Sequence, residues 1–186
     1  DSPKNIAFNQ VEESVAGKFG EPVPTLLRLI SRCLDSDHDQ RVVVLSRVNH
    51  PRNIRGKDGT WVSVIKNLLN DDHKGRTEFS TTHKYKGLEQ PSVIILDADR
   101  YPLIHPFWIF QCVLGKDVQE IEDEERRLFY VAATRAQSNL TIMSTSGVIS
   151  PFVTSLKSDM KVPITKWDDL EPYRYPDFDS QSQGIL

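Results

Sequence analysis

Two spacings of apolar residues alternate along the chain. Between residues 24 and 34 the apolar positions recur at helical spacing, with Pro22 and Pro24 at the entry. Residues 42–45 form a short β-branched run, typical of a strand buried on both faces of a parallel sheet. A second helix is predicted over residues 61–69, beginning after Thr60. The first third of the chain therefore has the order helix, strand, helix.

The same alternation continues toward the carboxyl end. Residues 92–96 form an apolar strand that begins after Pro91 and stops at Asp97. A helix is predicted over residues 122–136, because four acidic residues suit the positive end of its dipole and the following positions are largely apolar. Residues 139–143 form a third strand. Strands that alternate with helices predict an α/β fold built on a parallel sheet.

Length and composition bound the organisation of the chain. Its 186 residues fit one domain, which we place at residues 1–166, and the acidic, proline-bearing stretch 167–186 is predicted to be an irregular tail. The net charge of −3 implies that any nucleic-acid contact is narrow or shared with another domain. No apolar run approaches the roughly 20 residues that cross a bilayer, so we expect no membrane partner and a cytoplasmic location.

Two cysteines, Cys33 and Cys112, lie far apart in the sequence and neither belongs to a Cys-x-x-Cys pair. This spacing predicts neither a disulfide framework nor a metal site, and both side chains are expected to be buried.

Arg135 is the most informative single residue in the chain. It lies at helical spacing from Leu128 and Ala132, so its charge is expected to be partly buried. A guanidinium removed from water needs an anion, either a neighbouring carboxylate or a bound phosphate. Asp97 and Asp99 are candidate ion-pair partners, and they follow a strand at the edge where α/β sheets place their ligands. The sequence leaves both interpretations of Arg135 open.

A second candidate for chemistry is the stretch 81–89, Thr-Thr-His-Lys-Tyr-Lys-Gly-Leu-Glu, directly before a predicted strand. Gly87 would let the backbone turn or approach a ligand closely. The carboxylate of Glu89 could accept hydrogen bonds from sugar hydroxyls, or it could be a solvated surface acid. So many reactive groups in one loop favour a functional role.

Three segments carry a resemblance to a known family. Residues 81–89, followed by an apolar strand, resemble motif V of the UvrD/Rep-type superfamily-one helicases. Residues 123–136 resemble motif VI, and residues 42–47 are similar to the weaker motif IV. All three motifs belong to the family's second motor domain, so the resemblance implies a RecA-like fold.

The resemblance also implies a nucleotide site. In that family ATP binds with Mg²⁺ between two RecA-like domains. By this resemblance Arg47 and Arg135 would face the γ-phosphate, Glu89 would hold the ribose, and Gly87 would lie in the nucleotide-binding loop. Arg135 would be the arginine finger, which stabilises the charge that develops during phosphoryl transfer.

By the same resemblance, His83 with Thr81 and Thr82 would contact the phosphate backbone of single-stranded DNA. A structural histidine is the alternative. Lys86 could meet phosphate, pair with a carboxylate, or be solvated.

The chain departs from the family in several respects. Ser46 stands where many members have an aromatic residue that stacks on adenine, and Gln90 stands where a phenylalanine or a small residue is common. About thirty residues separate Arg47 from Thr81, which resembles the compact branch. The sequence contains no Gly-x-x-x-x-Gly-Lys-Ser/Thr phosphate loop. The expected partner is therefore a first RecA-like domain of the same parent protein, without which the chain should not hydrolyse ATP.

Two rival interpretations remain. One is the motor part of a helicase-nuclease subunit, and the other is a non-catalytic module, derived from a helicase domain, that binds protein or nucleic acid.

Overall fold

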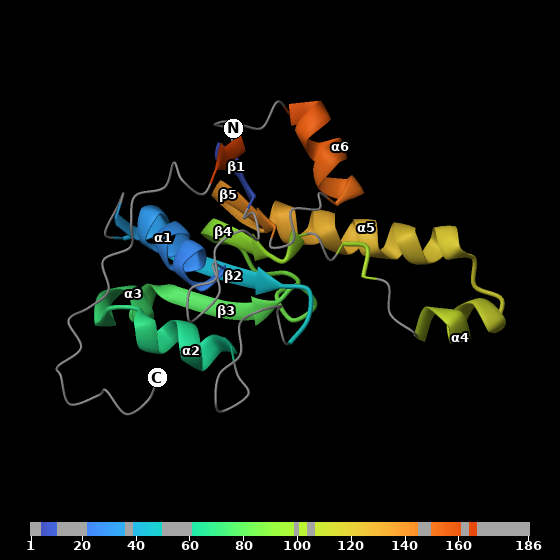
Figure 1. Ribbon diagram of the computed structural model, residues 1–186, viewed down its shortest axis with the longest axis horizontal. Helices are drawn as coiled ribbons and strands as arrows, with labels where there is room; N and C mark the ends of the chain where they lie inside the picture. The colour runs from blue at the N-terminus through green and yellow to red at the C-terminus, as the bar shows by residue number, and fades with distance from the viewer. Residues whose placement is uncertain are drawn as a thin grey trace.

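Six parallel strands form one sheet in the computed structural model, with the order β3-β2-β4-β5-β1-β6 (Figure 1). The structure describes residues 5–10, 22–35, 39–49, 61–98, 101–103, 107–144, 150–160 and 164–166. The strands are β1 (Asn5–Gln10), β2 (Val42–Ser46), β3 (Thr77–Thr81), β4 (Gln90–Leu96), β5 (Ala136–Ser144) and β6 (Ile164–Lys166). The helices are α1 (Pro22–Asp35), α2 (Trp61–Leu68), α3 (Asp71–Arg76), α4 (Phe107–Val113), α5 (Val118–Thr134) and α6 (Pro151–Met160).

Apolar residues that alternate along the central strands point to opposite faces of the sheet. Val42 and Val44 belong to one buried cluster, with side chains of α1 and α2, whereas Val43 and Leu45 belong to another, with side chains of α5 and α6. All five residues of β2 are buried. A sheet covered on both sides by helices is the predicted α/β arrangement, which is confirmed.

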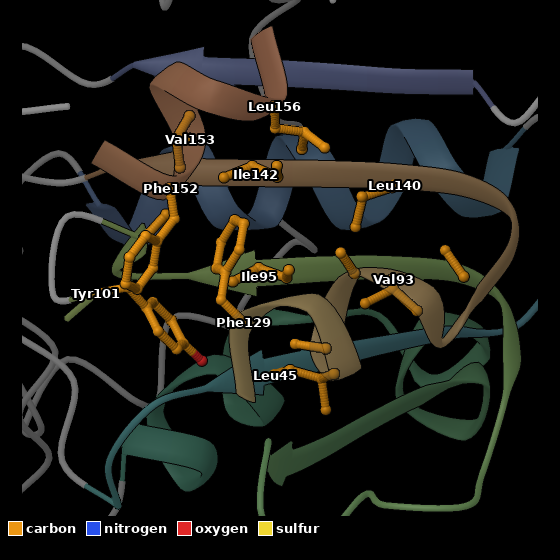
Figure 2. Packing of buried hydrophobic residues seen from close by; sticks show 14 of the residues in the cluster. Leu45, Val93, Ile95, Tyr101, Phe129, Leu140, Ile142, Phe152, Val153 and Leu156 are labelled. Atoms are coloured by element: carbon orange, nitrogen blue, oxygen red, sulfur yellow. The ribbon is translucent and has the colours of Figure 1, made fainter. Parts of the chain in front are cut away.

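Aromatic side chains fill the core between α5, α6 and the sheet (Figure 2). The ring of Phe129 packs edge-on against Tyr101, with 5.1 Å between centroids, and at 6.1 Å from Phe152. The rings of Phe129 and Tyr101 are almost completely buried. This cluster fixes the position of α5, and with it the position of Arg135 at the helix end.

The predicted helix and strand cores are confirmed, with two changes at the ends of the helix predicted over 122–136. Asp117 caps it by accepting a hydrogen bond from the backbone N–H of Gln119 at 3.2 Å, so α5 begins at Val118. The helix ends at Thr134, because Arg135 is its C-cap and Ala136 begins β5.

Several elements are not predicted by the sequence pattern, namely β1, α3, β3, α4, α6 and β6. The two cysteines are expected to be buried, but Cys33 and Cys112 are only partly buried. Thr60, the expected start of a helix, and the predicted tail over residues 167–186 lie outside the described residues. The domain boundary at 166 therefore stays a prediction.

Candidate functional site

The predicted site residues lie at two opposite edges of the sheet. Because every strand pair is parallel, the carboxyl ends of β2, β3 and β4 share one edge, where Arg47, Thr82 and Asp97 follow these strands. Glu89 and Arg135 lie at the amino edge, directly before β4 and β5. The structure thus divides the candidate residues between two sites.

The loop that resembles motif V connects these edges. Residues 82–89 run from the carboxyl end of β3 to the amino end of β4, and both strands pair with β2. The loop begins with a turn in which the N–H groups of Lys84 and Tyr85 donate to the carbonyl of Thr81. The buried ring of Tyr85 anchors its middle. Gly87 has a φ of 84°, a left-handed conformation that glycine adopts at low cost.

At the amino edge, Arg135 is partly exposed and held by neutral oxygens. Its Nε donates to the carbonyl of Val131 at 3.0 Å, and its Nη1 donates to the carbonyl of Leu88 at 3.3 Å. Its Nη2 donates to Oγ1 of Thr134 at 3.1 Å, and its own carbonyl accepts from the N–H of Gln90 at 3.0 Å. Within the described residues, none of these acceptors is a carboxylate. The positive charge of Arg135 is therefore oriented but not neutralised.

The alternative pairing of Arg135 with Asp97 is wrong. Asp97 follows β4 at the carboxyl edge, where it is buried and adopts a positive φ of 53°, whereas Arg135 lies at the amino edge. Asp99, the other expected partner, lies outside the described residues. Glu89, adjacent to Leu88, is exposed. Gly87, Glu89 and Arg135 thus lie at the same edge of the sheet.

At the carboxyl edge, Arg47 forms a bidentate ion pair with Glu125 of α5. Its Nε and Nη2 lie 2.9 and 2.5 Å from the two carboxylate oxygens, and the side chains are 14% and 10% exposed. The N–H of Leu103 donates to Glu125 at 3.2 Å. Burial opposes the charged form of Arg47, but the hydrogen bond and charge of Glu125 raise the pKa of Arg47 above its ordinary value. The pair joins the loop after β2 to α5.

Arg47 and Arg135 do not share a site in this structure. Arg47 contacts Glu125, which lies ten residues before Arg135 in the sequence. Ten residues of α-helix span about 15 Å along the axis. The predicted contact of both guanidiniums with one γ-phosphate is therefore not assembled here.

A hydrogen-bond network also joins the loops after β2, β3 and β4. Thr82 is buried, and its Oγ1 lies 2.9 Å from the hydroxyl of Tyr101, while its N–H donates to the carbonyl of Ser46 at 3.0 Å. Burial raises the pKa of Tyr101 to about 12, so its hydroxyl stays protonated. The hydroxyl of Ser46 donates to the carbonyl of Val48 at 2.7 Å and closes a turn. Thr81 is half-buried, and only His83 of the three predicted DNA-contacting residues is well exposed.

A groove of about 610 Å³ opens between this edge, α4 and α5. Arg47, His83 and Lys86 line one side, and Trp108 and Arg127 are among its residues from the two helices. In Figure 1, the amino-terminal half of α5 runs past the ends of β2 and β3, and α4 lies beyond it. Burial and the nearby charges of Arg47 and Lys86 lower the pKa of His83, against a smaller opposing effect of Glu125. His83 is therefore neutral at pH 7.

Sequence reasoning did not identify Glu125, Tyr101 or Trp108 as site residues. By sequence, Glu125 belongs to the acidic start of the helix, although its spacing of three and four residues from Leu128 and Phe129 places it on the buried face. That spacing is the signal that could have identified it.

Within the described residues, no group of three His, Cys, Asp or Glu side chains could hold a metal ion.

Comparison with known protein families finds a family that matches the segment containing the loop 81–89 and α5. Residues 63–147 match the family described as the UvrD-like helicase C-terminal domain. The match covers 85 of the 186 residues, and this segment is similar to that domain. The matched residues include the loop 81–89, α5 and Arg135, whereas Arg47 lies before the matched segment.

A curated relative of this chain is DNA helicase IV of Escherichia coli (strain K12). It is 29% identical over 135 residues, which cover 69% of this chain. The chain spans 18% of the length of that relative.

A solved structure has the same fold as this chain. It is the C-terminal domain of a possible DNA helicase from Lactobacillus plantarum WCFS1, with a TM-score of 0.52 and 16% sequence identity. The match covers 88% of this chain and 84% of the other. The predicted RecA-like α/β fold is confirmed. Among the described residues, no helix is long and apolar enough to cross a membrane.

Proposed function

We propose that this domain is the second RecA-like half of an ATP-dependent DNA helicase or translocase. ATP with Mg²⁺ would bind between it and a first RecA-like domain of the same parent protein. The observation that carries the proposal is the guanidinium of Arg135, held beside Leu88 and Glu89 by neutral oxygens. Its location within the matched residues 63–147 supports the same conclusion.

Arg135 acts as the arginine finger in this proposal. A guanidinium stabilises the charge on the equatorial oxygens of a transferring phosphoryl group, and such fingers contribute about 10³–10⁵ in rate. The hydrogen bonds from Arg135 to the carbonyls of Val131 and Leu88 orient the group before the reaction. A preorganised donor avoids a reorganisation cost during the reaction.

Glu89 and Gly87 form the remainder of the nucleotide site on this domain. The exposed carboxylate of Glu89 accepts hydrogen bonds from ribose hydroxyls, and the left-handed turn at Gly87 brings the loop to the amino edge. Since the chain has no phosphate loop, the first RecA-like domain must hold the β- and γ-phosphates and magnesium. The isolated chain is then inactive toward ATP.

A contact of Arg47 with the same γ-phosphate remains part of the proposal. In the present arrangement Arg47 is paired with Glu125, so this contact requires the ion pair to open or the nucleotide site to close around both residues. Variants of Arg47 and Arg135 can separate these roles.

Residues 81–83 form the contact with single-stranded DNA in the proposal. His83 is exposed at the carboxyl edge and would contact the phosphate backbone directly. Because the hydroxyl of Thr82 faces Tyr101 and its N–H donates to the carbonyl of Ser46, Thr82 would act by positioning the loop that carries His83. Thr81 is half-buried and ends β3.

The test is DNA-stimulated ATP hydrolysis by the full-length parent with Arg135→Ala. We expect a loss of at least about 10³-fold in turnover. Arg135→Lys keeps the charge but loses the planar fork, so it should recover only part of the activity. Arg47→Ala should reduce turnover as well if Arg47 reaches the γ-phosphate. Turnover that is unchanged in Arg135→Ala would contradict the proposal and favour a non-catalytic binding module.

A further inference from the structure

The groove of about 610 Å³ contains groups that the sequence motifs do not account for. Trp108 and Gln111 line it from α4, and Arg127 lines it from α5. Lys86 lines it from the loop that crosses between β3 and β4. Its volume is within the range of roughly 300–1,000 Å³ that ligand sites have.

Two cations of the groove, Lys86 and Arg127, are exposed. Neither forms a hydrogen bond or an ion pair within the part of the chain that the structure describes. In contrast, Arg47 is neutralised by Glu125, and Glu124 accepts from Lys116 at 2.7 Å. The charge available to a ligand is therefore positive, although the chain as a whole is negative.

Trp108 adds an aromatic surface beside these cations. It is half-buried and lines the groove, so part of the indole faces the space between α4 and the carboxyl edge. Available cations with an aromatic platform are the combination that binds single-stranded nucleic acid, where cations follow the phosphates and bases stack on rings. His83 lines the same groove as Lys86, Trp108 and Arg127. The groove therefore reaches the residue that is proposed to contact the strand.

We infer that this groove is a subsite for one nucleic-acid strand, with Lys86 and Arg127 on the phosphates and Trp108 stacked on a base. The inference rests on the proposed function and extends it from residues 81–83 to α4 and α5. An acidic peptide would satisfy the two cations but would leave the indole surface of Trp108 without a stacking partner. The bases of a double helix are stacked on one another and cannot stack on Trp108, so the strand must be single or locally unpaired.

The experiment measures the anisotropy of a fluorescently labelled oligothymidylate on adding the 186-residue protein. Trp108→Ala should weaken binding about tenfold, whereas Trp108→Phe should stay within about threefold of the wild type because an aromatic platform remains. Lys86→Ala with Arg127→Ala should weaken binding and reduce the slope of log K against log salt by about 1.4, or about 0.7 for each phosphate that is no longer neutralised.

A matched control removes two positive charges outside the groove. Lys74 pairs with Asp71, and Arg126 lies over the ring of Phe152, so Lys74→Ala with Arg126→Ala gives the same change in net charge. This control should bind the strand like the wild type. Unfolding transitions measured by circular dichroism establish that each variant is folded.

Three outcomes would overturn the inference. In the first, the variants of Trp108, Lys86 and Arg127 bind within about twofold of the wild type, whereas His83→Ala binds weakly. This result would not contradict the proposed motor function. In the second, the matched control loses as much affinity as Lys86→Ala with Arg127→Ala. In the third, a polyglutamate peptide of equal charge displaces the strand at equal concentration. If Arg135→Ala leaves ATP hydrolysis unchanged, the proposed motor function is overturned. That result would not affect the inference that the groove binds a strand.

Discussion

At the residue scale, the best-defined interaction of the carboxyl edge is the ion pair between Arg47 and Glu125. Both side chains are largely buried, and Glu125 also accepts from the N–H of Leu103. Removal of one partner from such a pair leaves an uncompensated charge away from water. The stability of this edge therefore depends on both residues together.

Glu125→Ala should lower the free energy of unfolding by about 3–5 kcal/mol, because it leaves the buried charge of Arg47 without its partner carboxylate. The double variant Arg47→Met with Glu125→Leu should be closer to the wild type, since it removes both charges. Urea denaturation followed by circular dichroism measures both. A decrease below about 1 kcal/mol in Glu125→Ala would show that water solvates Arg47 adequately.

If His83 contacts the strand as proposed, strand binding should depend on pH. Burial, Arg47 and Lys86 lower its pKa below 6.5, while Glu125 opposes them, so folding favours the neutral imidazole. His83 therefore contributes stability above pH 6.5, and this contribution is lost as the pH falls through the lowered pKa. A phosphate favours the protonated imidazole, so strand binding takes up a proton.

The affinity for oligothymidylate should accordingly rise as the pH is lowered from about 8 to below about 6.5. His83→Asn should have a flatter profile, because it cannot be protonated in this range. Anisotropy titrations at several pH values measure both proteins. Identical profiles would show that His83 does not face the strand.

At the scale of elements, α5 connects the two edges of the sheet. Glu125, near the middle of the helix, pairs with Arg47 at the carboxyl edge, and Arg135 caps the end of the helix at the amino edge. Phe129 lies between them and packs against Tyr101 and Phe152. Small displacements of this helix would move both Glu125 and Arg135.

Phe129→Ala should destabilise the fold by about 3–5 kcal/mol through reduced burial and a cavity. Phe129→Leu should cost less because it fills more of the space. Thermal unfolding measures both, and Tyr130→Ala is a matched control because Tyr130 is 40% exposed. Equal destabilisation by Phe129→Ala and Tyr130→Ala would contradict the packing described.

The short helix α3 depends on its cap. Asn70 accepts the N–H of His73 at 2.7 Å, and His73 Nε2 lies 3.1 Å from Asp35 on α1. Asn70→Ala should lower the free energy of unfolding by about 1 kcal/mol, whereas Asn70→Asp should retain the cap. Chemical denaturation compares the two, and equal stability of both variants would contradict this role.

The elements that the sequence predicts are those whose apolar pattern is strong. β2 and β4 are evident because continuous apolar runs are needed where helices cover both faces of the sheet. The edge strand β3 is not predicted because Phe79 is the only apolar residue among residues 77–81. The helix α3 is not predicted because its six residues contain no apolar side chain. Tertiary contacts, such as that of His73 with Asp35, hold such elements in place.

At the scale of the whole molecule, the fold separates residues that are close in sequence. Residues 81–89 form one candidate site in the sequence, but the parallel sheet puts His83 at the carboxyl edge and Glu89 at the amino edge. The sequence could predict the motifs and the partly exposed cation at Arg135. It could not predict which edge each residue occupies, because that depends on the strand order and on a crossover without a helix.

The central claim is that this domain completes a composite ATPase. The most direct measurement compares DNA-stimulated ATP hydrolysis by the full-length parent with hydrolysis by the 186-residue chain alone. Turnover in the parent should rise on adding single-stranded DNA, and the chain alone should show none. An absence of hydrolysis in both proteins would contradict the motor, as would equal hydrolysis by the chain alone.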